Sequence, residues 1–212
     1  MLELGFKALI AYLLGSVSGS LLLGRLKGVD IRTQGSGNAG GTNALRTQGF
    51  AFALGVVVID VGKALLAVGW LSGAALPGIG IDPGVDREWL VVACATAVVL
   101  GHVYPVWYEF RGGKGAATLI GAVGVVSPLA LLPVVGAWLL TVVLTGYVGL
   151  GTMLASATLP VYFALAMPGH PAYVAFGIAA AAFIVYTHRS NVQRMRDGVE
   201  NRARRLWLLR PR

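Results

Sequence analysis

Charged residues are scarce in this chain of 212 residues. Asp, Glu, Lys and Arg together make up only 12% of it, whereas a soluble domain carries about 25%. Hydrophobic residues account for 56%. A chain with so few charged residues cannot present a mainly polar surface to water when it folds. The composition therefore excludes an ordinary soluble domain and indicates an integral membrane protein, with the lipid bilayer as its first partner.

Cysteine is nearly absent as well. Cys94, the single cysteine, lies in an apolar run, so no disulfide framework can form within the chain. The sequence also lacks a His/Cys metal cluster, a Gly-x-Ser-x-Gly elbow, a His-x4-Asp acyltransferase pair and the aspartate-rich signature of CDP-alcohol transfer. We expect no metal ion and no cofactor.

The net charge of +8 is distributed unevenly. Basic residues cluster in three places: near 25–46, at 111–114 and from Arg189 to Arg212. Because cytoplasmic loops of membrane proteins are enriched in Lys and Arg, these three regions are predicted to face the cytoplasm, with the N-terminus and the loop 73–88 outside. The basic tail suits anionic lipid, and no nucleic acid partner is expected.

Apolar runs predict transmembrane spans near 4–24, 50–72 and 89–107, the first retained rather than cleaved. No Asp, Glu, Lys or Arg lies between Lys114 and Arg189. Since both ends of 116–188 are placed inside, this region crosses an even number of times, and four crossings of about 18 residues fit. We predict an all-α bundle of seven helices forming one domain, 1–212, with breaks near 134–136, 151–153 and 168–171.

The stretch from Gln34 to Arg46 has the composition of a phosphate-binding loop. Glycine permits positive φ, and successive backbone N–H groups in such turns form anion-binding nests. Thr42 or Asn43 could cap a short helix whose N-terminus adds to this field, and Arg46 could bind phosphate through two hydrogen bonds. Neither the lysine nor the strand of a nucleotide P-loop is present. The residues expected to contact substrate here are Gly35, Ser36, Gly37, Asn38, Gly40, Thr42, Asn43 and Arg46.

A second glycine-rich cluster lies at 110–115, with a helix expected directly after it. Its candidate residues are Gly112, Gly113, Lys114 and Gly115. Glycines around a cation at a helix N-terminus suit a second phosphate or a carboxylate, with Lys114 as a point charge. The alternative is a tight basic turn on the inner side of the membrane.

A third polar cluster begins where the last span ends. His188 and Asn191 are three residues apart and therefore share a helix face, which we expect to meet the two glycine-rich loops. The alternative is a membrane-exit boundary followed by a basic tail. For the last arginines of the chain this alternative is our prediction: Arg202, Arg204, Arg205, Arg210 and Arg212.

Three polar residues lie deeper in the spans. Asp60 and Lys63, three apart in the second span, are expected to form a structural ion pair that faces the bundle interior. His102, near the inner end of the third span, is a candidate to line the substrate site. The alternative is a packing residue, which is the more common part of a single histidine among apolar neighbours.

These motifs together resemble the bacterial acyl-phosphate:glycerol-3-phosphate acyltransferases, the PlsY family. The resemblance rests on Gly-Ser-Gly-Asn-x-Gly-x-Thr-Asn-x-x-Arg at 35–46, Gly-Gly-Lys-Gly-x-Ala-Thr at 112–118 and His-Arg-x-Asn-x-x-Arg-x-x-x-Gly-x-Glu at 188–200. Asp60 with Lys63 and Gly-His-x-Tyr-Pro at 101–105 also match. Departures include Ala39 in place of the usual proline and Gly41 in place of the usual alanine.

The resemblance implies an enzyme of the bacterial inner membrane with its active site on the cytoplasmic side. Such enzymes transfer a fatty acyl group from acyl phosphate to the 1-hydroxyl of sn-glycerol 3-phosphate, without a metal. The products are lysophosphatidic acid and phosphate, in the first membrane step of phospholipid synthesis. It also implies that Glu200 is structural, that Gly112, Gly113 and Gly115 hold glycerol phosphate, and that the catalytic residues are Ser36, Arg46, Lys114, His188 and Asn191. We expect a monomer.

Acyl phosphate is a mixed anhydride with a good leaving group, so positioning and charge stabilisation can supply most of the catalysis. We expect Ser36 to orient phosphate rather than form an acyl-enzyme, because no base adjoins it in sequence. Two candidates for the base stay open: the phosphate of the substrate and His188. Two other functions are considered, a membrane transporter for an organic phosphate and a scaffold that binds through its basic tail.

Overall fold

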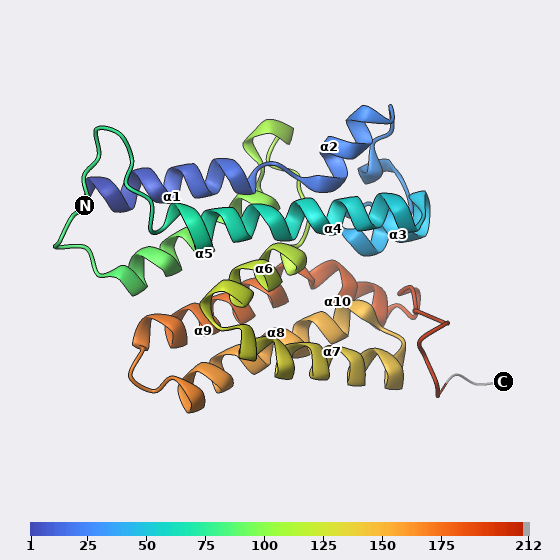
Figure 1. Cartoon of the computed structure of the whole chain (residues 1–212). Helices are drawn as coiled ribbons and strands as arrows, with labels where there is room; N and C mark the ends of the chain where they lie inside the picture. The colour runs from blue at the N-terminus through green and yellow to red at the C-terminus, as the bar shows by residue number, and fades with distance from the viewer. Residues whose placement is uncertain (210–212) are drawn as a thin grey trace. The chain divides into compact units, whose positions relative to one another are not determined.

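The computed structural model describes residues 1–209 and is helical throughout (Figure 1). Within these residues no strand forms, and an isolated bridge pairs Leu76 with Ile79. The predicted all-α class is therefore confirmed. The chain divides into two compact units, Met1–Val126 and the part from Ser127 onward.

The first unit contains the region of both glycine-rich loops. Its helices are α1 (Leu2–Gly15), α2 (Gly19–Leu26), α3 (Gly41–Gln48), α4 (Phe50–Ala64), α5 (Arg87–Val103) and α6 (Ala116–Val126). Shorter elements are the 3-10 turns η1 (Ile31–Thr33) and η3 (Val106–Tyr108) and the π-helix η2 (Leu65–Leu71), which continues α4.

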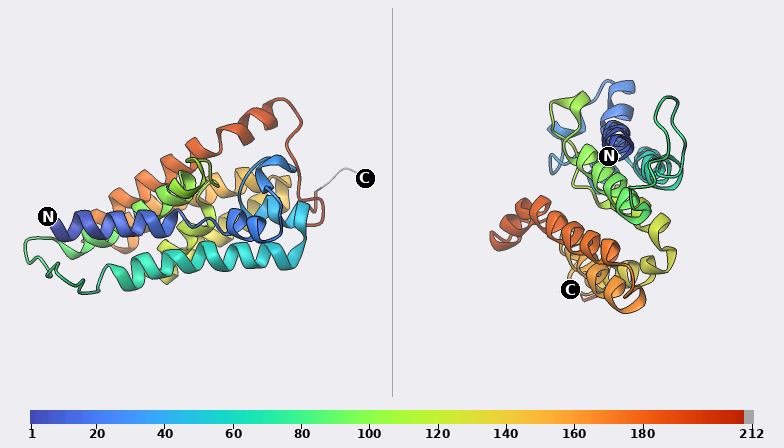
Figure 2. Two further views of the ribbon diagram at one scale, coloured as in Figure 1. Left: turned by 90° about the horizontal axis from the view of Figure 1, so that it is seen from above. Right: turned by 90° about the vertical axis from the view of Figure 1, so that its left-hand side faces the viewer.

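The second unit contains four helices and one turn. These are η4 (Pro128–Ala130), α7 (Leu131–Thr145), α8 (Val148–Ala166), α9 (Pro171–Thr187) and α10 (Arg189–Arg196). Consecutive helices α7, α8 and α9 run antiparallel and pack side by side (Figure 2).

Within residues 1–209, four helical stretches are long and apolar enough to cross a membrane: Phe50–Leu71, Arg87–Tyr108, Pro128–Thr145 and Val148–Ala166. Two pairs, α1 with α2 and α9 with α10, reach that length only as bent pairs. The apolar helix α6 has 11 residues, or about 16 Å of a hydrocarbon layer roughly 30 Å thick. A multi-pass helical architecture follows, whereas the number seven remains a prediction.

Two of the predicted breaks in the charge-free region are wrong. The structure breaks the chain at Ser127 and at Gly146, and α7 runs through 134–136 while α8 runs through 151–153. Pro133 does not break α7 because it lies in the first turn, where a backbone N–H has no intrahelical acceptor. The real end of α7 is Gly146, which has φ 76°. The predicted break near 168–171 matches the end of α8 and the start of α9.

The first apolar run, predicted as one span, is interrupted. Helix α1 ends at Gly15 and α2 begins at Gly19 with a bend of 45°. Backbone groups freed by the break bind α4: Lys63 Nζ donates to Gly15 O (2.8 Å) and Val17 O (2.9 Å), and the Gly19 N–H donates to Asp60 Oδ1 (3.0 Å). A broken helix is tolerated at membrane depth only when other groups satisfy its backbone. The Asp60–Lys63 pair therefore makes this interruption possible.

A second buried ion pair holds the end of the first unit at which the chain begins (Figure 1). Lys7 Nζ donates to Glu3 Oε1 (2.8 Å) and to Ser72 O (2.8 Å). The Arg87 guanidinium donates through both Nη atoms to the two Glu3 oxygens (2.8 and 2.9 Å), and the Asp82 N–H donates to Glu3 Oε2 (2.8 Å). This network ties α1 to the end of η2 and to the loop before α5. The opposite charges four residues apart in the first apolar run are the sequence signal for it.

Close helix contacts depend on glycine. A Cβ added to Gly101 of α5 would lie 2.9 Å from Gly15 C and Ser16 N, which are backbone atoms of the neighbouring α1. In contrast, a Cβ added to Gly62 of α4 would meet no atom within 4 Å. The two sites therefore differ in whether helix packing requires glycine.

Gly101→Ala should destabilise the protein by about 1–3 kcal/mol, because the new methyl group meets backbone that cannot move aside. Gly62→Ala is the matched control and should be neutral or stabilising by up to about 1 kcal/mol, since alanine is the better helix former. Thermal unfolding of both variants in the same detergent measures the difference. Equal midpoints for the two variants would contradict the assigned contact.

Candidate active site

Asn43 organises the first glycine-rich loop from within. Its Oδ1 accepts the Ser36 N–H (2.9 Å), and its Nδ2 donates to Ile31 O (3.2 Å) and Gln34 O (2.9 Å). Gly35 has φ 55°, and a Cβ there would collide with the Asn43 amide. Asn43 is 1% exposed. Its side chain therefore shapes the loop, and Ser36 is held at the point where the loop turns toward α3.

Helix α3 begins at Gly41, and Gly40 is its N-cap without a side-chain hydrogen bond. The prediction that Thr42 or Asn43 caps this helix is wrong, because both residues already lie inside its first turn. The first N–H groups of the helix have no intrahelical acceptor, so the expected anion-attracting end is present. Thr42 and Arg46 are exposed and, four residues apart, lie on one face of the helix.

The second glycine-rich loop closes against the end of α5. The Gly112 N–H donates to Val103 O (3.1 Å), and the Gly113 N–H donates to His102 O (3.2 Å). Gly115 has φ 90°, and α6 begins at the next residue, so the predicted helix start is confirmed. Lys114 is half-buried directly before that start.

Arg32 fixes the base of the first loop. Asp30 accepts hydrogen bonds from the Arg32 backbone N–H (2.9 Å) and from its Nε and Nη2 atoms (3.0 and 2.8 Å). The hydrogen bonds from the Arg32 guanidinium lower the pKa of the Asp30 carboxyl from its ordinary value. Both groups therefore stay ionised at neutral pH, and the arginine is held in one orientation.

Arg32 and Gly113 bring the two loops together. Arg32 Nη1 donates to Tyr108 O (3.3 Å), just before the second loop, and to Arg111 O (3.4 Å), within it. A Cβ added to Gly113 would lie 2.8 Å from Ala39 O in the first loop. The two clusters predicted separately from the sequence thus lie next to each other in the first unit. Arg32 was not among the predicted site residues, and only its place directly before the loop could have marked it.

Behind the loops lies a buried polar group made of Asp60, Lys63 and His102. His102 Nδ1 lies 2.9 Å from Lys63 Nζ and 3.3 Å from Asp60 Oδ1, and Lys63 Nζ lies 3.1 Å from Asp60 Oδ1. Since an ammonium can only donate, His102 Nδ1 accepts from Lys63 and Nε2 carries the ring proton. The ring edge at Nε2 faces Gly113. His102 is 2% exposed, so it supports the second loop from below.

The remaining predicted residues belong to the second unit. His188 lies at a bend of 49° between α9 and α10. Its Nδ1 is 2.8 Å from Ile184 O, and because a carbonyl only accepts, Nδ1 carries the proton. The Asn191 N–H donates to His188 O (2.8 Å), so both residues sit in one turn. Their predicted approach to the two glycine-rich loops stays a prediction.

Glu200 braces this turn. Its Oε1 accepts from Asn191 Nδ2 (2.7 Å), and its Oε2 accepts from Arg194 Nε (2.6 Å). A Cβ added to Gly149 of α8 would lie 2.7 Å from Asn191 Nδ2, so Asn191 is also held against that helix. These contacts agree with a structural part for Glu200.

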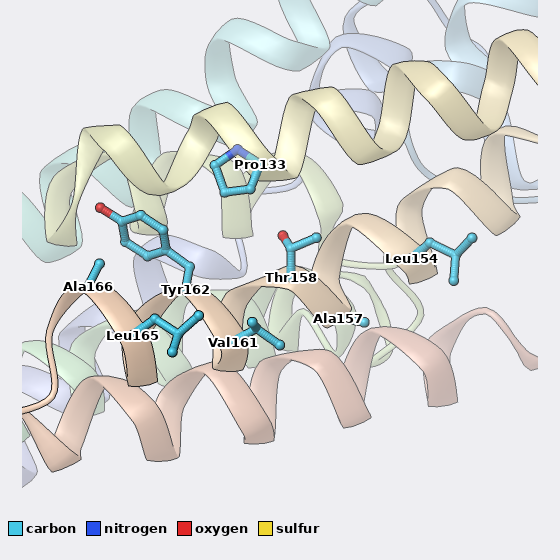
Figure 3. Close-up of a pocket in the computed structure, with 8 residues that line it drawn as sticks. All are labelled: Pro133, Leu154, Ala157, Thr158, Val161, Tyr162, Leu165 and Ala166. Carbon is cyan, nitrogen blue, oxygen red and sulfur yellow. The ribbon is translucent and has the colours of Figure 1, made fainter.

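An open apolar cavity of about 470 Å³ lies between α7 and α8 in the second unit (Figure 3). Pro133 contributes from α7 and the other lining side chains from α8. The lining residues are Pro133, Leu154, Ala157, Thr158, Val161, Tyr162, Leu165 and Ala166. Without a cation in its lining, this cavity suits hydrocarbon and not phosphate.

Comparison with known families gives one consistent result. The chain matches the family model described as glycerol-3-phosphate acyltransferase over residues 6–198. The glycerol-3-phosphate acyltransferase of Symbiobacterium thermophilum is 42% identical over 203 residues, which cover 95% of this chain and 96% of the relative. The enzyme of the same name from Synechococcus elongatus is 42% identical over 197 residues, which cover 92% of each chain.

Solved structures agree with this result. The crystal structure of PlsY (YgiH), an integral membrane glycerol 3-phosphate acyltransferase, in its glycerol 3-phosphate form has a TM-score of 0.79 at 35% identity and covers 94% of each chain. The lysophosphatidic acid form of PlsY (YgiH) has a TM-score of 0.76 at 33% identity, again over 94% of each chain.

Lys63→Met should destabilise the protein by about 3–5 kcal/mol, because it leaves the buried Asp60 carboxylate and two backbone carbonyls without their cation. Lys27→Met, at an exposed lysine of the same unit, is the matched control. Adding Asp60→Asn to Lys63→Met should recover part of the loss, since it removes the unpaired charge. Unfolding in detergent measures all three, and a Lys63→Met variant as stable as the control would refute the assigned pairing.

Proposed function

This chain belongs to the glycerol-3-phosphate acyltransferase family, and we propose that it transfers a fatty acyl group from acyl phosphate to the 1-hydroxyl of sn-glycerol 3-phosphate. Family membership makes it an acyltransferase and a membrane enzyme of lipid synthesis. One observation supports the phosphate-linked donor above all others: two glycine-rich loops meet at Ala39 and Gly113. Both substrates of the proposed reaction carry a phosphate, and each loop offers one a cradle.

We propose that each loop binds the phosphate of a different substrate. The N-terminus of α3, Ser36 and the exposed Arg46 bind the phosphate of the acyl donor, while Lys114 and the glycines of 112–115 bind glycerol 3-phosphate. The 1-hydroxyl oxygen attacks the acyl carbon, a C–O bond forms, and the bond from that carbon to the phosphate oxygen breaks. The electron pair leaves with inorganic phosphate, whose growing negative charge the cations stabilise.

The proton of the attacking hydroxyl needs an acceptor. We propose that the phosphate of glycerol 3-phosphate itself takes it, because the second pKa of a phosphate monoester lies near 6. The alternative base is His188, which is 5% exposed and donates through Nδ1 to Ile184 O. With Nδ1 donating to this carbonyl, Nε2 is the ring nitrogen through which His188 would accept the proton.

We also propose a topology, a domain organisation and a copy number for the enzyme. Basic residues around both loops support a cytoplasmic active site, with the N-terminus outside, the C-terminus inside and seven spans in the bacterial inner membrane. The family model covers parts of both compact units, which supports a single acyltransferase domain. We propose that one copy of the chain suffices, because each predicted catalytic residue is present in it.

Purified protein in detergent should release phosphate from palmitoyl phosphate only when sn-glycerol 3-phosphate is present, and should form lysophosphatidic acid in the presence of EDTA. An active relative serves as the control for assay conditions. Absence of release alongside an active control would overturn the proposal. Uptake of glycerol 3-phosphate into liposomes would then test the alternative of a transporter for organic phosphate.

Variants of the two loops, measured in the same assay, distinguish which loop binds which substrate. Arg46→Ala should lower kcat/KM for acyl phosphate by about 10- to 150-fold, because a hydrogen bond to a charged group contributes about 1.5–3 kcal/mol. Lys114→Ala should instead raise the KM for glycerol 3-phosphate by a similar factor. Arg25→Ala, at an exposed arginine in α2, is the control and should match the parent. The opposite assignment of substrates to loops would exchange the two effects.

His188→Gln should keep the shape of the pH profile of kcat, with a reduced maximum, if the phosphate of the substrate is the base. Glutamine retains a donor for the Ile184 carbonyl but cannot accept a proton near neutral pH. Loss of the acidic limb of the profile in this variant would instead identify His188 as the base.

A further inference from the structure

The chain continues past the matched family region, which ends at residue 198, and its next residues fold back onto α7. Helix α10 ends at Arg196. Gly198, two residues later, has φ 72°, and the Val199 N–H donates to Arg194 O (2.9 Å). This turn reverses the chain after the helix. We call the segment from Glu200 to Leu208 the C-terminal strap.

The strap binds the last turn of α7. The Ala203 N–H donates to Gly146 O (2.7 Å), the Leu208 N–H donates to Val143 O (3.1 Å), and Trp207 Nε1 donates to Leu144 O (3.1 Å). The last carbonyls of a helix have no intrahelical donor, so these three bonds satisfy groups that would otherwise need water. The strap therefore acts as a cap for α7.

Arg202 locks the strap in place. Its guanidinium lies over the ring of Tyr147 (4.4 Å to the centroid) and over the ring of Trp207 (4.2 Å), and Nη2 donates to the Tyr147 hydroxyl (2.7 Å). Arg202, predicted as part of a basic tail, is exposed, but its guanidinium also lies against two aromatic rings from different segments. Arg204 and Arg205 are exposed as predicted, and Arg210 and Arg212 lie outside the described residues.

The strap connects this lock to the proposed catalytic machinery. Two residues before Arg202, the Glu200 carboxylate accepts from Asn191 Nδ2 and from Arg194 Nε. A carboxylate at the end of a loose tail would lose conformational freedom on forming these bonds, whereas one anchored next to Arg202 has lost it already. The position of the Asn191 amide therefore depends on contacts made at the end of α7.

We propose that the C-terminal strap is a positioning element, in which Arg202 and Trp207 hold Glu200 so that Glu200 orients Asn191 for acyl transfer. The proposal rests on the function given above, in which Asn191 belongs to the active site. It assigns a purpose to residues beyond the matched family region. It also predicts that removing the strap lowers turnover although no predicted catalytic residue is lost.

The test compares three forms of the full protein with the parent: a chain truncated after Asn201, Arg202→Met, and Arg204→Met as the matched control. The truncated chain and Arg202→Met should lose kcat by about 10- to 100-fold, because a small displacement of a catalytic group has effects of this size. The KM for both substrates should change little, and Arg204→Met should match the parent.

A double-mutant cycle separates positioning from general stability. If the strap acts through Glu200, then Arg202→Met should have little further effect on kcat in a Glu200→Gln background. Full kcat in the truncated chain, or effects of Arg202→Met and Glu200→Gln that simply multiply, would overturn the proposal.

Hydrogen exchange gives a readout that does not depend on activity. Truncation after Asn201 should raise amide exchange in α10, where Asn191 lies, while the helices of the first unit stay protected. Unchanged exchange in α10 would refute the strap even in an active enzyme. A parent protein without activity would refute the proposed function, and exchange would then still decide whether the strap orders α10.

Discussion

The ammonium of Lys63 is the interaction on which the first unit depends. It enters the interruption between α1 and α2, donates to Gly15 O and Val17 O, and lies 3.1 Å from Asp60 Oδ1. A helix cannot open in hydrocarbon unless its backbone groups find new partners, and here one side chain from α4 supplies them. Opening the helix redirects the chain at α2, so that η1 and the first glycine-rich loop follow directly. The geometry of the first loop is thus a consequence of a buried cation that follows the loop in sequence and lies in another helix.

The same ammonium reaches the second loop through one more residue. It donates to His102 Nδ1, and the opposite edge of that ring packs on Gly113, whose missing side chain also admits Ala39 O. Any larger residue at Gly113 would separate the loops, because both neighbours are fixed: the ring by Lys63 and the carbonyl by its own loop. Position 113 therefore requires glycine because the absence of a side chain lets the two loops lie close together. The conformational freedom of glycine matters less here. The Asp60–Lys63 pair, the His102 ring and Gly113 together set the distance between the two loops.

Composition and charge predicted much of this molecule, because hydrophobic length and basic loops are local properties of the sequence. The helical class, the polar clusters and the start of α6 follow from them. The interruption of the first span was missed because its cause, Lys63, lies in another helix. Asn43 was assigned to substrate, yet its amide binds its own loop. The sequence of the motif does not show in which direction this side chain points. Arg202 was assigned to the basic tail because the sequence does not show which aromatic rings it meets. These rings are Tyr147, between α7 and α8, and Trp207 of the strap.

Four side-chain cations of the first unit are already paired with carboxylates. In the first unit Lys7 and Arg87 are bound to Glu3, Arg32 is bound to Asp30, and Lys63 is bound to Asp60. Lys7 and Lys63 are buried, where the low dielectric makes pairing necessary. Arg32 and Arg87 are each held by several hydrogen bonds to their carboxylates. Arg46 differs, because within residues 1–209 it forms no ion pair and it is exposed on α3, one turn beyond Thr42. A cation without a carboxylate, one turn from the start of α3, has its charge available for an anion. This supports our proposal that the first loop binds the phosphate of the acyl donor.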